Sequence, residues 1–225
     1  MNARAMQLSF EIKIGQFSNY DFPMPLQSHE IQDFLNEAQG EETEEMYKSF
    51  EKTELDRTAL SSLIYNQVFA MFSTGTAEAH PNGHIVSIPT TVWFPIEERC
   101  TIAYTDCNDQ SQTKNVRVLP ITHDEYNMNV NNPYAKPSED LVWRMELGAT
   151  GAYYKRHELI TDGSITINSY NLRYLKRPID IDLVDGVSSE LDPTIHDHIV
   201  DRAVQIALEA RGVAAAQVIN QNQES

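Results

Sequence analysis

The chain has 225 residues, with 17 basic and 33 acidic side chains, so its formal net charge is −16. This length suits one domain, or one domain with an added helical arm, and it excludes a need for a metal or a disulfide in folding. No apolar run is long enough to cross a membrane, residues 1–10 lack the apolar core of a secretory signal, and the acidic charge argues against a direct grip on nucleic-acid phosphates. The two cysteines, Cys100 and Cys107, are too few for a disulfide scaffold and indicate a reducing compartment.

The first segment, residues 3–16, carries two conflicting periodicities. Apolar residues alternate with polar ones between Leu8 and Ile14, which is typical of a strand. Apolar residues also recur at helical spacing between Met6 and Phe17. Periodicity alone therefore leaves helix and strand open for this segment.

A helix is predicted over residues 28–48, with Ser28 as its N-cap. The later part of this helix carries a run of glutamates: Glu37, Glu41, Glu42, Glu44 and Glu45. A solvated face is the ordinary explanation of such a run, but acidic residues near a helix C-terminus oppose the macrodipole, which suggests a basic partner in an assembly. A second helix, from Thr53 to about Val68, is predicted to complete a helical hairpin.

Between residues 84 and 184 the pattern becomes that of β-structure. Short runs rich in β-branched and aromatic residues alternate with turn signals, which predicts an antiparallel sheet or sandwich. The last of these runs is residues 179–184. Pro89, Pro95 and Pro120 lack a backbone donor, so we expect them at strand ends or sheet edges.

The C-terminal region predicts one further helix. Asp192 is a good N-cap, Pro193 suits the first helical position, and Gly212 is expected to end the helix. Its apolar stripe is predicted to be buried against the N-terminal helices and comprises Ile195, Ile199, Ala203, Ile206, Ala207 and Ala210.

The predicted fold class is α+β, with a helical part and a β-rich insert. The expected ranges are 1–75 for the N-terminal helical part, 76–185 for the β-rich part, 186–212 for the C-terminal helix packing back on the helical part, and 213–225 for a polar tail.

Three groups of residues could carry chemistry, and a structural role is favoured for each. His196 and His198 are two residues apart, so on a helix they point to different faces and chelate poorly. His80 and His84 flank a turn. The triplet at 123–125 (His-Asp-Glu) lacks a nucleophile and more simply builds a turn or a helix cap.

The remaining candidates are also assigned to structure. Neither cysteine has the neighbours that would lower its pKa, and no catalytic or phosphate-binding motif occurs. Trp93 and Trp143 are expected to anchor the core. Because alternate residues of a strand face opposite sides, Arg144 should point away from Trp143, and Arg173 away from Tyr174. We therefore predict no catalytic residue, cofactor or metal.

Six segments, spread over nearly the whole chain, resemble the neck and tail ring proteins of crAss-like phages, which are short-tailed phages of gut Bacteroidales. These segments are MNARAMQLSFE at 1–11, HEIQDFLNEAQ at 29–39, SFEKTELDRTALSSLI at 49–64, PITHDEYNMNVNNPYAKPSEDLVWRMEL at 120–147, LRYLKRPIDIDL at 172–183 and ELDPTIHDHIVDRAVQIALE at 190–209. More distantly, they are similar to the head-to-tail adaptor of other podoviruses. The most specific parts are NNPYAKP and LDPTIHDHIVDRAV.

The resemblance implies a non-enzymatic virion protein, made in the bacterial host cytoplasm. Copies would form a ring, which is expected to hold twelve and to contact the portal and other ring or tail proteins. Genome DNA would pass nearby without being bound sequence-specifically, and no contact with a membrane is expected. It also favours a helix over residues 3–16. The alternatives are a virion-associated wall or capsule hydrolase and an infection protein that binds host factors.

Two groups of residues are candidate interface elements. Ordered loops often carry binding, which points to the loop at 131–137. The acidic helix face is the second group, and it is expected to face either a partner or the DNA channel. The candidates are Asn131, Asn132, Pro133, Tyr134, Lys136, Glu41, Glu44 and Glu45.

Overall fold

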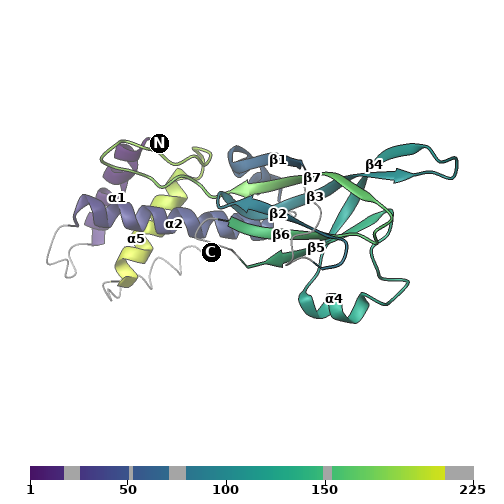
Figure 1. The fold of residues 1–225 in the computed structure, drawn as a ribbon. Helices are drawn as coiled ribbons and strands as arrows, with labels where there is room; N and C mark the ends of the chain where they lie inside the picture. The colour runs from purple at the N-terminus through teal and green to yellow at the C-terminus, as the bar shows by residue number, and fades with distance from the viewer. Residues whose placement is uncertain (18–25, 51–52, 71–79, 149–153, 211–225) are drawn as a thin grey trace. The chain divides into compact units, whose positions relative to one another are not determined.

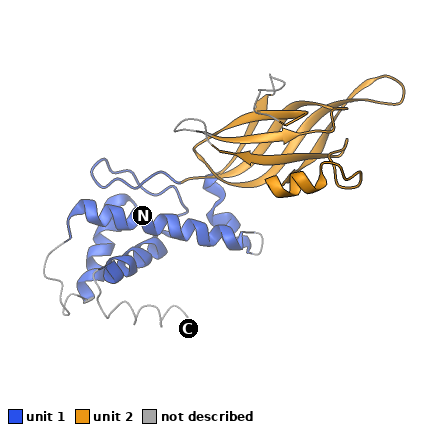
Figure 2. Cartoon of the chain, turned by 60° about the horizontal axis from the view of Figure 1, so that its bottom comes forward, with its two compact units in different colours: residues 1–63, 178–225 blue, residues 64–177 orange. Residues whose placement is uncertain are grey.

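The computed structural model describes residues 1–17, 26–50, 53–70, 80–148 and 154–210. Within these residues the chain forms five α-helices and a seven-stranded sheet, which confirms the predicted α+β class (Figure 1). The chain divides into two compact units, coloured separately in Figure 2. We call residues 1–63 with 178–225 the helical unit and residues 64–177 the β-unit.

The first segment is a helix, α1 (Ala3–Phe17), as the family resemblance implied. Met6 and Phe10 are fully buried, whereas Leu8 and Ile12 are more than half exposed. The strand-like alternation therefore arose from two apolar residues on the solvent side of a helix. No described helix is both long enough and apolar enough to span a membrane.

Helix α2 (Ser28–Ser49) begins where the sequence predicts, but the N-cap residue is Gln27 rather than Ser28. The backbone N–H of Gln27 donates to Glu30 Oε2 at 2.8 Å, which satisfies one donor at the helix start. One face of α2 is buried, through Ile31, Leu35, Ala38, Gln39, Thr43 and Met46.

The predicted second helix is wrong beyond its first turns. Helix α3 (Glu54–Ala59) and a short 3₁₀ turn (Ser61–Leu63) end at strand β1 (Ile64–Ala70). The β-branched and aromatic residues of β1 favour extended backbone, and β1 pairs antiparallel with β7 (Thr166–Lys176) along its whole length. Phe69 stacks on Tyr170, with ring centroids 6.0 Å apart, so tertiary pairing overrides the helical spacing.

The C-terminal helix, α5 (His196–Ala210), packs against α1 and α2. Ile199 is fully buried and Ile195 nearly so, whereas Ile206 is only half-buried. The helix begins later than predicted because residues 193–195 form a turn. Asp192 caps that turn through Oδ1, which accepts the Thr194 N–H at 2.9 Å. The predicted end at Gly212 and the tail 213–225 lie outside the described residues.

The predicted strand at 179–184 is not formed, and only an isolated bridge joins Asp182 to Val187. Side chains of α2 bind the backbone that a strand partner would have bound. Asn36 bonds both the N–H and the C=O of Ile181, at 2.6 and 3.1 Å. One turn on, Gln39 donates to the Ile179 C=O at 3.0 Å. These contacts attach the segment to a helix instead of a sheet.

The seven strands form one sheet in the order β1-β7-β3-β4-β5-β6-β2. The strands not yet given are β2 (Gly83–Pro89), β3 (Val92–Thr105), β4 (Ser111–Pro120), β5 (Leu141–Leu147) and β6 (Tyr154–Ile160). One pair departs from the expected antiparallel order, because β4 and β5 are parallel. Their connection contains α4 (His123–Asn129), which supplies the crossover that parallel neighbours need.

The prolines lie where their missing donor is tolerated. Pro89 ends the edge strand β2, and Pro120 ends β4. Pro95 lies inside β3, but β4 pairs only with Arg99–Thr105 of that strand, and the register with β7 shifts just after Pro95. The first half of β3 is therefore a local edge with a bulge.

The sheet has a core on each face. The larger core lies on one face and includes Ile88, Ile102, Leu159, Tyr170 and Leu172. On the other face, Trp143, Met145 and Ile160 pack under Tyr126 of α4, which lies alongside β5 in Figure 1. Trp143 is thus a core anchor, as predicted. Trp93 is half-buried and stacks on Phe94, outside both described cores.

Candidate functional site

The first candidate surface lies in the connection between β4 and β5, which contains α4 and the loop at 131–137. Thr122 caps α4: its hydroxyl accepts the Glu125 N–H at 3.2 Å, and Glu125 Oε2 accepts the Thr122 N–H at 2.7 Å. The Glu125 carboxylate also accepts a bond from the Thr122 hydroxyl at 3.1 Å, and the bonds that it accepts from the Thr122 N–H and hydroxyl hold its pKa below the ordinary value. Tyr126 contacts Trp143 edge-on, so the 123–125 triplet serves as a helix start, as its structural interpretation predicted.

Hydrogen bonds within the loop at 131–137 order it, through both the side chain and the backbone of Asn132. Asn132 Oδ1 accepts the Tyr134 N–H at 3.1 Å, and the Asn132 C=O accepts the Lys136 N–H at 3.0 Å. Asn131, Pro133 and Lys136 are exposed, and Pro137 is buried.

Three apolar side chains of this connection face solvent. Met128 is 77% exposed, Val130 38% and Tyr134 97%. We call these three residues the tip patch. Single exposed apolar residues need no explanation, whereas exposed apolar surface that is contiguous marks interaction sites, so we treat these three residues of one connection as a candidate contact surface.

The acidic candidates on α2 divide into two kinds. Glu41 Oε2 lies 2.6 Å from Arg202 Nε of α5, so this carboxylate is used within the chain. Glu44 and Glu45 are exposed and form no ion pair with another described residue. Burial and the charge of Glu45 raise the pKa of the neighbouring Glu42 above its ordinary value. The face therefore keeps negative charge that the described chain does not compensate.

The histidine candidates do not converge. His196 is buried, and its Nε2 donates to the Leu191 C=O at 3.0 Å, whereas His198 is exposed. His80 Nδ1 lies 2.9 Å from the buried Glu158 Oε2. Among the described residues, no three His, Cys, Asp or Glu side chains are grouped to hold a metal ion.

The cysteines are separate and unlike. Cys100 is buried in β3, and this burial raises the pKa of its thiol to about 12. Cys107 is exposed in the turn between β3 and β4. Since the thiolate is the reactive form, Cys100 is an inert core residue at neutral pH.

A buried polar network, which sequence reasoning did not identify, crosses the sheet from β3 to β5, β6 and β7. Arg144 forms an ion pair with Glu98: its Nη2 donates to Oε1 at 3.0 Å, and its Nε lies 3.0 Å from Oε2 without the alignment of a hydrogen bond. The Tyr170 hydroxyl donates to Glu98 Oε2 at 2.7 Å. Because that hydroxyl has one proton, its oxygen accepts the bond from His157 Nδ1 at 3.0 Å. Arg144 does point away from Trp143, as strand alternation predicts.

The network holds its members in their structural protonation states. Burial, followed by the charges of Arg144 and Lys155, lowers the pKa of His157 to about 3. Burial and the Glu98 charge raise the pKa of Tyr170 well above its ordinary value. His157 is therefore neutral and Tyr170 protonated at pH 7. Each member bonds at least one other member, and Arg144 Nε alone among their side-chain nitrogens is buried without a hydrogen bond, so the arrangement links four strands of the sheet.

Comparison with known proteins shows the family to which the chain belongs. Residues 9–218 match the family described as phage tail ring protein 3/4. The chain is 30% identical over 205 residues to ring protein 3 of Bacteroides phage crAss001, which covers 81% of this chain and 85% of that protein. It is 32% identical over 106 residues to ring protein 4/5 of the same phage, covering 40% and 44%. The chain belongs to the phage tail ring protein 3/4 family and is a structural ring protein of a crAss-like phage virion.

Proposed function

We propose that copies of this protein form a closed ring in the neck of the particle, below the portal, and connect head to tail around the channel through which the genome passes. The ring holds twelve copies and contacts the portal and other ring or tail proteins. The observation that carries this proposal is the family match, which extends over residues 9–218 and therefore includes both candidate surfaces. Synthesis in the host cytoplasm and a role in genome ejection follow from the same proposal.

A closed ring needs two different patches on each subunit, because each copy meets its two neighbours through unlike faces. The chain offers unlike surfaces on its two units. The acidic face of α2 belongs to the helical unit, and the tip patch belongs to the β-unit. This supply of unlike patches supports a ring rather than a two-fold dimer.

The charge of the chain suits a channel that DNA must cross without adhering. Twelve copies would carry roughly −190 in total at −16 each, although charges beyond about 8–10 Å are largely screened. Net negative charge repels phosphates and lowers affinity for the duplex. We therefore propose that the protein binds no DNA sequence specifically, although DNA passes close to it.

We also propose that the protein acts without catalysis. Cys100 is buried with a raised pKa, and His157 is buried and neutral. In the buried network, Arg144, Glu98, Tyr170 and His157 are linked in a chain of contacts within the β-unit. The two named relatives are ring proteins, which agrees with a structural role.

The tip patch tests the interface part of this proposal. Replacing Tyr134 and Met128 by serine is expected to leave thermal stability unchanged, because both side chains are exposed. We expect incorporation into particles to fall about tenfold or more, as for the loss of two interface anchors. The measurement is mass spectrometry of purified particles from cells in which the plasmid-encoded variant competes with the phage-encoded protein.

Val184→Ser is the matched control, because Val184 is also exposed, at 87%, but lies in the helical unit outside the tip patch. It should enter particles at the wild-type ratio. Equal incorporation of the tip variant and the wild type would show that the tip patch docks nothing.

A further inference from the structure

The charge of the chain is concentrated in one of its two units. The β-unit holds 10 basic and 12 acidic side chains, a net of −2. The helical unit holds the remaining 7 basic and 21 acidic side chains, a net of −14. The β-unit is therefore almost neutral overall, so a local cluster of basic side chains on it is not outweighed by acidic charge of its own unit.

The β-unit gathers arginines on one face of its sheet. Arg99 of β3 lies directly opposite Arg117 of β4, and Arg173 of β7 lies opposite Glu97 of β3. Because Glu97 and Arg99 are two residues apart on one strand, all four side chains are on the same face. We call Arg99, Arg117 and Arg173 the arginine face. Like charges placed directly opposite destabilise a sheet, so the pairing of Arg99 with Arg117 does not stabilise the fold. A role in binding would explain it.

Little within the described chain neutralises this face. Arg99 pairs with Glu97, and its side chain is still 60% exposed. Arg117 and Arg173 are exposed and form no ion pair with another described residue. The face is therefore positive and accessible in an otherwise acidic protein.

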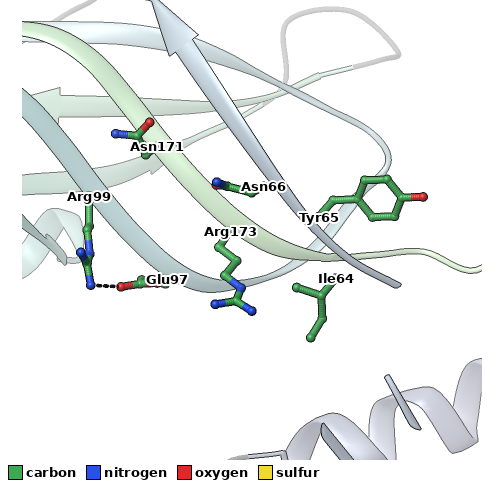
Figure 3. A pocket seen from close by; sticks show the side chains of 7 residues that line it. All are labelled: Ile64, Tyr65, Asn66, Glu97, Arg99, Asn171 and Arg173. Atoms are coloured by element: carbon green, nitrogen blue, oxygen red, sulfur yellow. Dashed lines mark ion pairs between the residues drawn. The ribbon is translucent and has the colours of Figure 1, made fainter. Parts of the chain in front are cut away.

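The arginine face is hollowed in two places that share Arg99. One hollow, of about 410 Å³, is lined by Arg99, Arg173 and Glu97 together with two asparagines (Figure 3). The other, of about 590 Å³, lies where β3 and β4 separate and is lined from both faces of the sheet, by Arg99 and Arg117 and by Arg144 of the opposite face. Arginine in such recesses suits carboxylates, which it can bind with two parallel bonds.

Helix α2 presents carboxylates in a matching row. Asp33, Glu37 and Glu44 lie within roughly 40° of one another at 3.6 residues per turn. All three are exposed and form no ion pair with another described residue. We call them the acidic stripe. Asp33 and Glu37 are four residues apart, so they are separated by about 6 Å along the helix axis. Arginines on neighbouring strands are separated by roughly 4.8 Å, so the spacing of the carboxylates is similar to that of the arginines.

We propose that the arginine face of one copy binds the acidic stripe of the next copy, and that this is the lateral contact of the ring. The inference rests on the proposed ring and assigns its lateral contact to these two surfaces. The acidic stripe shares Glu44 with the acidic face of α2, and the tip patch is left for a contact with another ring or tail protein. An acidic helix is favoured over DNA as the occupant, because the chain as a whole repels phosphates and Glu97 lies within the face.

The test is a charge-reversal exchange with the full-length protein, followed by sedimentation velocity over a concentration series at about 50 mM salt. The basic-face variant carries Arg117→Glu and Arg173→Glu, and the stripe variant carries Glu37→Arg and Glu44→Arg. The wild type should self-associate, more weakly as salt is raised. Each variant alone should associate at least about tenfold more weakly, because attraction becomes repulsion.

An equal mixture of the two variants should restore association, because each reversed face then meets an oppositely charged one. Lys155→Glu with Arg4→Glu is the matched control: both side chains are exposed, neither is on the arginine face, Arg4 lies on α1 in the helical unit, and the net charge changes equally. This control should associate like the wild type.

Three results would overturn the inference: no wild-type association at any concentration, a mixture that does not associate, or a control that is weakened as much as the basic-face variant. Duplex DNA binding that the basic-face variant loses would identify the genome as the occupant instead. A neck ring in which α2 touches no neighbouring sheet would reject this pairing and leave the ring standing. Absence of any ring would reject both.

Discussion

Ile199→Ala should lower the free energy of unfolding of the helical unit by about 2–5 kcal/mol. Ile199 is fully buried in α5, the helix that packs against both α1 and α2. The truncation removes buried apolar surface and leaves a cavity among α1, α2 and α5. The apolar stripe of α5 holds these three helices together. Urea denaturation followed by far-ultraviolet circular dichroism measures this loss.

Ile12→Ala is the matched control, because it makes the same chemical change on α1 at a side chain that is 56% exposed. Its effect should stay within about 0.5 kcal/mol. Equal stability of the Ile199 variant and the wild type would show that the stripe is not core and that α5 is an interface element.

Arg144→Met should destabilise the β-unit by about 3–5 kcal/mol, because it leaves the carboxylate of Glu98 buried without its cation. The Tyr170 hydroxyl would remain as a donor to that carboxylate, and it carries no charge to offset it. The double variant with Glu98→Gln should recover part of the loss, since the unpaired charge is removed. Urea denaturation of the full chain measures all three proteins.

Arg117→Met is the control, because Arg117 is exposed on the neighbouring strand β4 and should change stability by no more than about 0.5 kcal/mol. If Arg144→Met behaves like Arg117→Met, the network does not brace the sheet. If the double variant is as unstable as Arg144→Met, the cost does not come from the buried Glu98 charge.

Local sequence patterns were sufficient where burial and periodicity agree. The stripe of α5 predicts the burial of Ile195 and Ile199, because one face of that helix packs against two others. The alternation of α1 favoured a strand because Leu8 and Ile12 are apolar yet exposed. The helical spacing from Met6 to Phe17 pointed the other way, and the family resemblance favoured the helix.

Other errors came from long-range partners that no local window contains. Residues 64–70 follow helical spacing but pair with β7, more than 90 residues later, and the pairing decides the structure. Residues 179–184 have strand composition, but side chains of α2 take their backbone bonds. In both cases the hydrogen-bond partner overrides the propensity.

The candidate surfaces were predictable to different degrees. The loop at 131–137 was proposed because ordered loops often carry binding; the structure places Tyr134 in solvent, and the interface role stays a prediction. The buried network could not be found from sequence, because Glu98, Arg144, His157 and Tyr170 come together only through the strand order. The arginine face depends on the same order, since register alone sets Arg99 against Arg117.

The measurement that tests the account most directly is an electron cryo-microscopy reconstruction of the neck of the purified particle. The account predicts a closed ring of twelve copies of this chain, located below the portal with the DNA channel at its centre. A neck and tail without this protein, or copies that form no closed ring around the channel, would contradict it.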